Sequence, residues 1–156
     1  MRAATLKGIY LFAELDPSEL SRLQAICAMR TVAGGDDVFN HGDVADALYV
    51  INYGTVRIHR DTPEIDEIAV TTLGTGAHFG ELPWISRGTR SATATALEKT
   101  ELTRIPYASL SHLLADQPAM GVKVYRALAR QMASALRTTT DDLVFARIHA
   151  RHHSAT

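Results

Sequence analysis

A run of short β-branched and aromatic segments restricts the fold of this chain more than any other feature. Six such segments lie at 36–40, 47–52, 55–60, 67–73, 91–97 and 100–106. Turn residues at Gly42-Asp43, at Gly54 and at 61–64 separate the first four. Short strands at close, regular spacing are typical of a β-roll or barrel, not of a parallel sheet that alternates with helices.

Helical patterns flank this run on both sides. Asp16 precedes Pro17, and Glu19 lies three residues after Asp16, which together form a capping-box helix start. Apolar residues then recur at helical spacing until two consecutive glycines in "AGGDD" break the pattern. After the strands, the sequence predicts a short helix that ends at Pro118 and a long helix from about 118 to 146. The expected fold class is α+β, mainly β: an antiparallel, jelly-roll-like β-roll flanked by N-terminal helices and a long C-terminal helix.

The long helix carries a stripe of mostly apolar or small residues at alternating spacings of four and three. Its members are Tyr125, Ala129, Met132, Leu136, Thr139, Leu143 and Ala146. This heptad pattern is typical of a helix that packs along a partner helix, so we expect a homodimer. A helix that lies on its own β-roll would tolerate the same pattern.

Composition excludes several classes of function. The net charge of the 156-residue chain is −1, which argues against attachment to nucleic acid or to an anionic membrane. No signal peptide and no apolar run of membrane-spanning length are visible, so we expect a cytoplasmic protein. Cys27 is the single cysteine, and we expect it to serve in packing. The terminal His149, His152 and His153 lack acidic or cysteine neighbours, so no metal site is expected.

The segment 78–96, "HFGELPWISRGTRSATATA", contains the most specific candidate site. It sets Glu81 after a glycine and places Arg90 nine residues later. The two could form a structural ion pair, which often adds little stability. The surrounding residues also suit a ligand: Gly80 permits close backbone approach, and one helical turn at "ELPWIS" would present amides to an anion. Arg90 suits a phosphate and Glu81 suits a sugar hydroxyl, so the segment could hold a small phosphorylated sugar.

The order "FGEL", then Arg90, then Ser-Ala-Thr resembles the phosphate-binding cassette of cyclic nucleotide-binding domains. The strand pattern "FNHGDVADALYVINYGTVRI" and the flanking helices are similar too, so the resemblance covers residues 6 to 145. It implies that Glu81 accepts the ribose 2′-hydroxyl and that Arg90 pairs with the cyclic phosphate. It also includes Gly80, Leu82 and Ser91 in the site. The resemblance also favours cAMP over cGMP, because the cGMP-selective members of the family more often carry threonine after the arginine, where this chain has Ser91.

The long helix resembles the dimerising helix of the catabolite-activator group within this family. That resemblance implies that Thr139 and Thr140 contact the adenine from the two subunits. Alternatively, the three consecutive threonines, which are poor helix formers, mark a break with Thr139 as the cap of a new turn.

Three departures from the family pattern affect the expected function. Pro83 has no N–H, where relatives often use an amide to bind phosphate, and Thr89 replaces the common proline before Arg90. After Leu143 only 13 residues remain, too few for a winged helix-turn-helix module, so no DNA binding by this chain is expected. The resemblance thus implies a domain over 1–146 with helices at 6–30, a β-roll at 31–106 and helices at 107–146. A flexible tail would follow at 147–156.

The leading hypothesis is a stand-alone regulatory domain that binds cAMP or cGMP and signals through its C-terminal helix to an unknown effector. It could also be a piece of a longer protein. The alternative is a degenerate domain that binds no nucleotide and acts as a dimerisation or docking scaffold. An enzyme such as a metal-dependent cupin is not expected, because His41, His59 and His78 are scattered singly and no catalytic constellation appears. No cofactor is expected.

Overall fold

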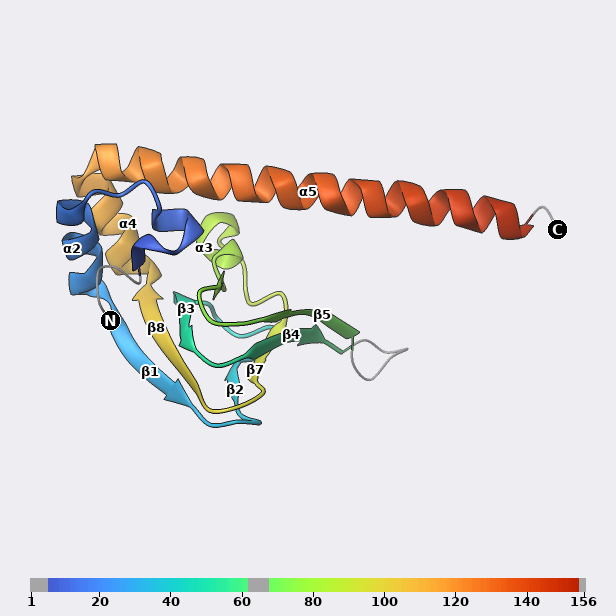
Figure 1. Ribbon diagram of the computed structural model, residues 1–156, viewed down its shortest axis with the longest axis horizontal. Coiled ribbons are helices and arrows are strands. Elements are labelled where there is room, and N and C mark those ends of the chain that lie inside the picture. Colours follow the sequence, from blue (N-terminus) through green and yellow to red (C-terminus); the bar gives the residue numbers. More distant parts are fainter. Residues whose placement is uncertain (1–5, 62–67, 155–156) are drawn as a thin grey trace.

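Two antiparallel four-stranded sheets form the centre of the computed structural model, which describes residues 6–61 and 68–154 (Figure 1). One sheet has the strand order β1-β8-β3-β6 and the other β2-β7-β4-β5. The strands are β1 (Ala28–Val32), β2 (Asp37–Phe39), β3 (Ala47–Tyr53), β4 (Val56–Arg60), β5 (Ile68–Leu73), β6 (His78–Phe79), β7 (Thr93–Ala96) and β8 (Thr100–Pro106). The predicted antiparallel β-roll is confirmed.

Apolar side chains from both sheets make the core of the roll. Val56 and Ala94 from one sheet share a buried cluster with Ile51, Phe79 and Leu102 from the other. β3 is buried over its first five residues because both of its faces are covered: Ala47, Tyr49 and Ile51 pack in the core of the roll, and Leu48 and Val50 pack in a second core. The sequence of β3 is therefore a nearly continuous apolar run and does not alternate between apolar and polar residues.

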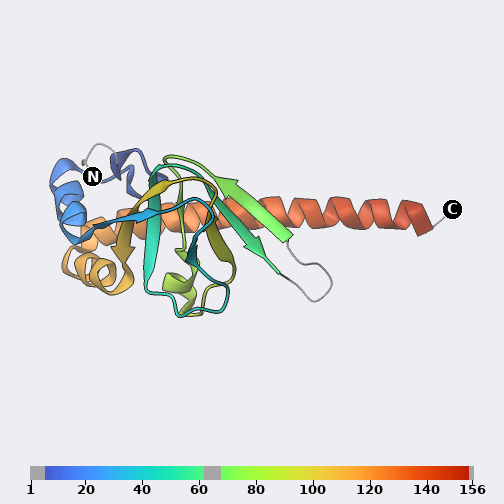
Figure 2. The ribbon, with the colours of Figure 1, turned by 90° about the horizontal axis from the view of Figure 1, so that it is seen from below.

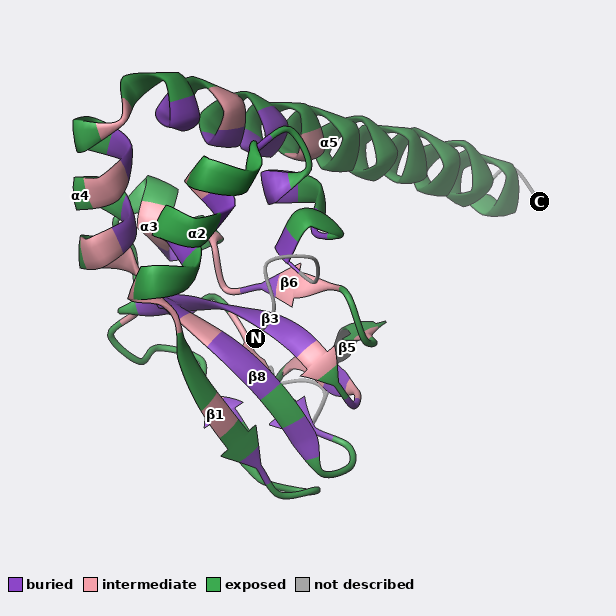
Figure 3. Ribbon diagram, turned by 60° about the vertical axis from the view of Figure 1, so that its left-hand side comes forward, coloured by how far each residue is buried: buried purple, intermediate pink, exposed green. Residues whose placement is uncertain are grey.

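A second core lies at one end of the roll, under the helices (Figures 1 and 3). The helical elements are η1 (Tyr10–Phe12), α2 (Pro17–Ile26), α3 (Leu82–Ser86), α4 (Tyr107–Asp116) and α5 (Pro118–Ser154). The predicted capping box is present: the Asp16 carboxylate accepts from the Glu19 amide at 2.8 Å, and the Glu19 carboxylate accepts from the Asp16 amide at 3.0 Å. Leu20 and Leu23 of α2 point into this core.

The predicted N-terminal helical range, 6–30, is wrong at its end. α2 stops at Ile26, and β1 begins at Ala28 and pairs with β8 along its whole length. No glycine or proline separates helix from strand here, so the sequence offered no local stop signal. The two-residue strand β6 was also not predicted. Some expected features lie outside the described residues: residues 1–5 of the domain, residues 62–67 of the turn and the strand after it, and residues 155–156 of the tail.

α5 is a single continuous helix that projects beyond the roll (Figure 2). Its first turns are buried at Met120, Val124 and Leu128, whereas every residue from 132 to 154 is exposed. It continues through 147–154, where the sequence predicts a flexible tail, and this segment contains neither glycine nor proline. Helix consequently makes up 48% of the structure and strand 27%. Within the described ranges, no helix has the combination of length and hydropathy that a membrane span requires.

Candidate functional site

A cavity of about 220 Å³ opens between α3 and the sheet that contains β4 and β5. It has a charged end, formed by the segment from β6 to β7, and an apolar end. Its lining residues are Phe39, Ile58, Thr71, Leu73, His78, Phe79, Gly80, Glu81, Leu82, Pro83, Arg90, Ser91 and Ala92. Of the seven residues predicted for the site, the fold therefore brings together Gly80, Glu81, Leu82, Arg90 and Ser91.

The backbone of Arg90 is fixed by the loop before β3. The Arg90 amide donates to Asp43 O at 2.9 Å, and the Gly42 amide donates to Arg90 O at 2.8 Å. The neighbouring Thr89 forms an isolated bridge with Val44. The two loops thus hold each other, and the position of the arginine does not depend on a ligand.

The Arg90 side chain is 2% exposed and already has several partners. Nη2 donates to Ala47 O at 2.7 Å, and Nη1 donates to Gly80 O at 3.0 Å and to the Tyr107 hydroxyl at 3.1 Å. The guanidinium carbon lies 4.0 Å from the centre of the Phe39 ring. Nε, in contrast, is buried without a hydrogen-bond partner among the described residues.

Electrostatically, Arg90 is a buried cation with a weak counter-ion. Asp46 Oδ1 lies 3.9 Å from Arg90 Nη2, but this carboxylate is largely exposed and pairs more closely with Arg104, at 2.8 Å. Tyr107 completes the cage, because its hydroxyl also donates to Gly80 O. Burial raises the pKa of the Tyr107 hydroxyl, and the nearby Arg90 charge opposes that rise. Because burying a cation is costly without compensation, an anion that reaches Nε would be bound favourably.

Gly80 is required by the geometry of this cage. Its φ of +82° lies in the left-handed region, and a Cβ there would lie 2.9 Å from Arg90 Nη1. Glycine thus allows the carbonyl of residue 80 to approach the guanidinium closely.

Glu81 and His78 form the second polar group of the cavity. The Glu81 side chain is 14% exposed and His78 is 6% exposed, and His78 Nδ1 lies 3.5 Å from Glu81 Oε2. Glu81 and Arg90 both line the cavity, but no ion pair between them is found among the described residues. The alternative of a structural Glu81–Arg90 ion pair is therefore not what the structure shows.

α3 is a single turn in which Pro83 is buried at the start. Pro83 has no N–H, and the Trp84 amide donates to Glu81 O at 3.1 Å. The turn therefore presents fewer amides to an anion than its length suggests. Trp84 points away from the cavity: its ring stacks on Tyr125 of α5 with centroids 5.3 Å apart, and its Nε1 donates to Ser111 of α4 at 2.8 Å.

Thr139 and Thr140 lie on the exposed part of α5 and are not among the residues that line the cavity. The Thr140 hydroxyl donates to Leu136 O at 2.9 Å, within its own helix. The alternative of a helix break at the threonines is wrong, since α5 runs through them. One copy of the chain does not bring these two residues to the site.

Sequence reasoning missed two residues of the site, Tyr107 and His78. Tyr107 follows β8 and reaches Arg90 only because β8 runs beside β3. His78 stands in the cassette segment itself, three residues before Glu81, and its place beside that acid was the available signal. Among the described residues, no cluster of three or more His, Cys, Asp or Glu side chains could hold a metal ion.

The comparisons with known proteins agree with this geometry. Residues 29–117 match the family described as "Cyclic nucleotide-binding domain". The "Cyclic AMP receptor protein" of Thermus thermophilus is 32% identical over 130 residues, which cover 83% of this chain and 60% of that protein. The "CRP-like cAMP-activated global transcriptional regulator" of Mycobacterium tuberculosis is 29% identical over 143 residues, covering 90% of this chain and 62% of that protein. The chain thus spans about three fifths of the length of these two relatives.

One similar solved structure has nearly the same extent as this chain. It is the N-terminal domain of a transcriptional regulator from Streptomyces coelicolor, which is 34% identical with a TM-score of 0.76. The match covers 89% of this chain and 94% of that one. With the family match over more than half of the sequence and the cassette residues assembled at one cavity, this chain belongs to the cyclic nucleotide-binding domain family.

Proposed function

We propose that the cavity binds a 3′,5′-cyclic nucleotide, with cAMP preferred to cGMP, and that α5 transmits occupancy to a partner protein. The observation that carries the proposal is the buried Arg90, whose Nε lacks a partner at a cavity with an acid nearby. Nε and the cavity-facing part of the guanidinium bind the cyclic phosphate, because an anion compensates the buried charge. The Glu81 carboxylate accepts the ribose 2′-hydroxyl.

The preference for cAMP rests on two supports. Ser91 follows Arg90, as in the cAMP-binding pattern of the family, and the names of two relatives refer to cAMP. The base lies at the apolar end of the cavity, near Ile58 and Leu73, where no charged side chain lines the cavity to distinguish one base from another. Thr139 and Thr140 contact the base only when a second copy brings its own α5 alongside.

The path from the cassette to α5 runs through Trp84. A shift of α3 on ligand binding would move the Trp84 ring, which stacks on Tyr125 and is tied to α4 by Ser111. The outer face of α5 provides the output, since Met132, Leu136 and Leu143 of the heptad stripe are exposed in one copy. This stripe supports a parallel two-helix homodimer.

Calorimetric titration with cAMP and with cGMP tests the proposal. The wild type should bind at least one nucleotide, and Glu81→Ala should weaken binding by about 10- to 100-fold, the loss of a hydrogen bond to a charged acceptor. Arg90→Ala should abolish binding, with circular dichroism as the control for folding because Arg90 is buried. Absence of binding of both nucleotides to a folded wild type at millimolar concentration would reject the proposal.

Two observations favour a second candidate function. Pro83 removes an amide from the cassette, and protein acceptors already occupy both terminal nitrogens of Arg90. A degenerate domain that serves as a dimerisation or docking scaffold would share these features. A dimer in sedimentation, together with a melting temperature that added nucleotide does not change, would select this function.

A further inference from the structure

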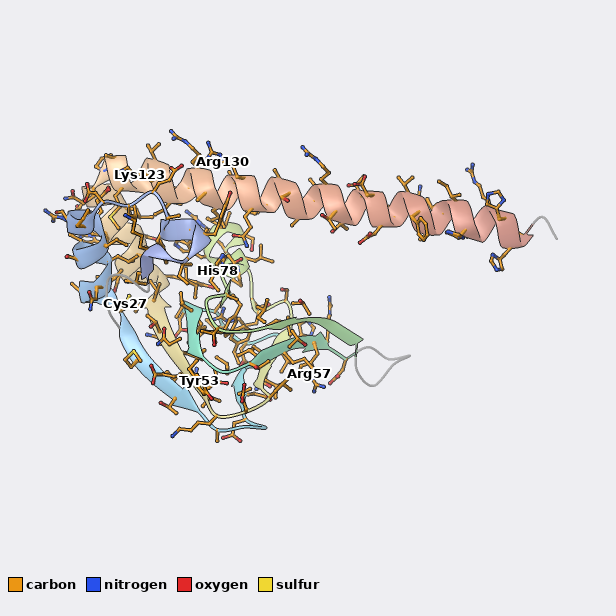
Figure 4. The ribbon with its side chains drawn as sticks, in the orientation of Figure 1. Cys27, Tyr53, Arg57, His78, Lys123 and Arg130 are labelled. Atoms are coloured by element: carbon orange, nitrogen blue, oxygen red, sulfur yellow. The ribbon has the colours of Figure 1, made fainter. Side chains whose placement is uncertain are left out.

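His78 is a titratable group inside the cavity to which the proposed function gives no role. Its side chain comes from β6, is 6% exposed, and lies under α3 at the charged end of the cavity (Figure 4). Nδ1 is buried without a hydrogen-bond partner among the described residues, yet it lies 3.5 Å from Glu81 Oε2. A small movement of either side chain would close this distance to a hydrogen bond.

The other groups that face the cavity limit what His78 can respond to. Its charged lining residues are Glu81 and Arg90, and behind Arg90 stand the Tyr107 hydroxyl and, at 3.9 Å, Asp46. The lining residues from β2, β4 and β5 are Phe39, Ile58, Thr71 and Leu73, none of which carries a charge. Glu81 is therefore the acid that can stabilise a protonated imidazole, and a bound anionic ligand would be the second source of negative charge.

We propose that His78 is a positioning residue for Glu81 and makes ligand binding dependent on protonation. The protonated imidazole donates Nδ1–H to Glu81 Oε2, which fixes the carboxylate and leaves Oε1 free to accept the sugar hydroxyl. A bound cyclic phosphate adds negative charge to the cavity and therefore favours the charged ring over the neutral one. Binding therefore takes up a proton, and affinity rises as pH falls through the range in which histidine titrates. This inference rests on the proposed function.

Calorimetric titration with cAMP between about pH 6 and pH 8 is the primary test, because histidine titrates in that range. The wild-type dissociation constant should rise on the order of 3- to 10-fold across it. Titration in two buffers of different ionisation enthalpy should show net proton uptake. His78→Asn places an amide nitrogen near the position of Nδ1, so it should retain affinity near neutral pH but lose the pH dependence. His78→Phe should lose both.

A sugar-modified ligand shows whether the effect passes through Glu81. In the wild type, 2′-deoxy-cAMP should bind more weakly than cAMP by about tenfold, the value of one hydrogen bond to a charged group. In His78→Phe this penalty should shrink, because the carboxylate is no longer held in place. A residue that serves only in packing would lower affinity for both ligands equally.

His112 offers a matched control, since it is 82% exposed, pairs with Asp116 and lies on α4 away from the cavity lining. His112→Asn should keep the full pH dependence. Equal pH slopes in wild type and His78→Asn, or equal 2′-deoxy penalties in wild type and His78→Phe, would overturn the inference while leaving nucleotide binding intact. A wild type that binds no nucleotide at any pH would instead refute the proposed function and this inference with it.

Discussion

Replacing Gly80 with alanine tests the cage around Arg90 directly. Gly80 has φ +82°, and an added Cβ would lie 2.9 Å from Arg90 Nη1 and 3.4 Å from the Phe39 ring. The guanidinium cannot move away easily, because Nη2 donates to Ala47 O at 2.7 Å and the guanidinium carbon packs on the Phe39 ring at 4.0 Å from its centre. The substitution should therefore break the hydrogen bond from Arg90 to Gly80 O.

Two costs add in this variant. A non-glycine residue in the left-handed region costs about 1–2 kcal/mol. Loss of a hydrogen bond to a charged group costs about 1.5–3 kcal/mol more. We expect Gly80→Ala to lower the free energy of unfolding by about 2.5–5 kcal/mol in total, and to weaken nucleotide binding because Arg90 is displaced.

Gly76→Ala is the control that separates the two costs. Gly76 has φ +87°, but an added Cβ there would meet nothing within 4 Å. Its expected cost is the backbone term alone, about 1–2 kcal/mol. Urea denaturation measures both variants, and thermal melts should differ by about 2–4 °C per kcal/mol. If Gly80→Ala is no more destabilising than Gly76→Ala, the Arg90 cage does not contribute as described.

Three further predictions follow from other contacts. Tyr107→Phe removes the hydroxyl that contacts both Gly80 O and Arg90. Urea denaturation should show that the free energy of unfolding falls by about 1 kcal/mol, and titration should show a weaker affinity for cAMP. An unchanged affinity would show that Tyr107 does not position Arg90. The Leu136 side chain is 68% exposed, so Leu136→Asp should not change the circular dichroism spectrum. In sedimentation it should convert the expected dimer to a monomer. A dimer that persists in this variant would exclude the α5 stripe as the interface. Desolvation raises the pKa of the Cys27 thiol to about 11. At about pH 8, the native thiol should therefore react with a thiol reagent roughly 100-fold more slowly than the same thiol in the urea-unfolded chain. Comparable rates would contradict the burial of Cys27.

The parts of the fold that sequence predicts well are those with local signals. The strands β2, β3, β4, β5 and β8 have a glycine, aspartate or proline at one end or both, and the capping box marks the start of α2. β1 was missed because its edge with α2 has no breaker and its stability comes from pairing with β8, about 70 residues away. The end of α5 was missed for the opposite reason: exposed residues gave no packing signal, although helix-compatible residues continue to Ser154.

The same distinction applies to the candidate site. Gly80, Glu81 and Arg90 lie within one short segment, so their motif could be recognised and the fold does place them at one cavity. Tyr107 could not be predicted, because its contact with Arg90 depends on the register of β8 against β3. Thr139 and Thr140 remain a prediction, since their role requires a second copy of α5.

The buried arginine explains how one feature can serve both stability and binding. Without ligand, three oxygens and an aromatic face stabilise Arg90. Its one nearby counter-ion among the described residues is the exposed carboxylate of Asp46, 3.9 Å away. Dipoles of neutral groups compensate a buried charge less completely than a counter-ion does, so the empty cavity retains part of the cost of burial. A cyclic phosphate would remove that cost without rearranging the arginine, because the Gly42, Asp43 and Ala47 contacts already fix it. Little binding free energy would then be needed to order the phosphate site. The remainder could stabilise a shifted position of α3 and, through Trp84, of α5.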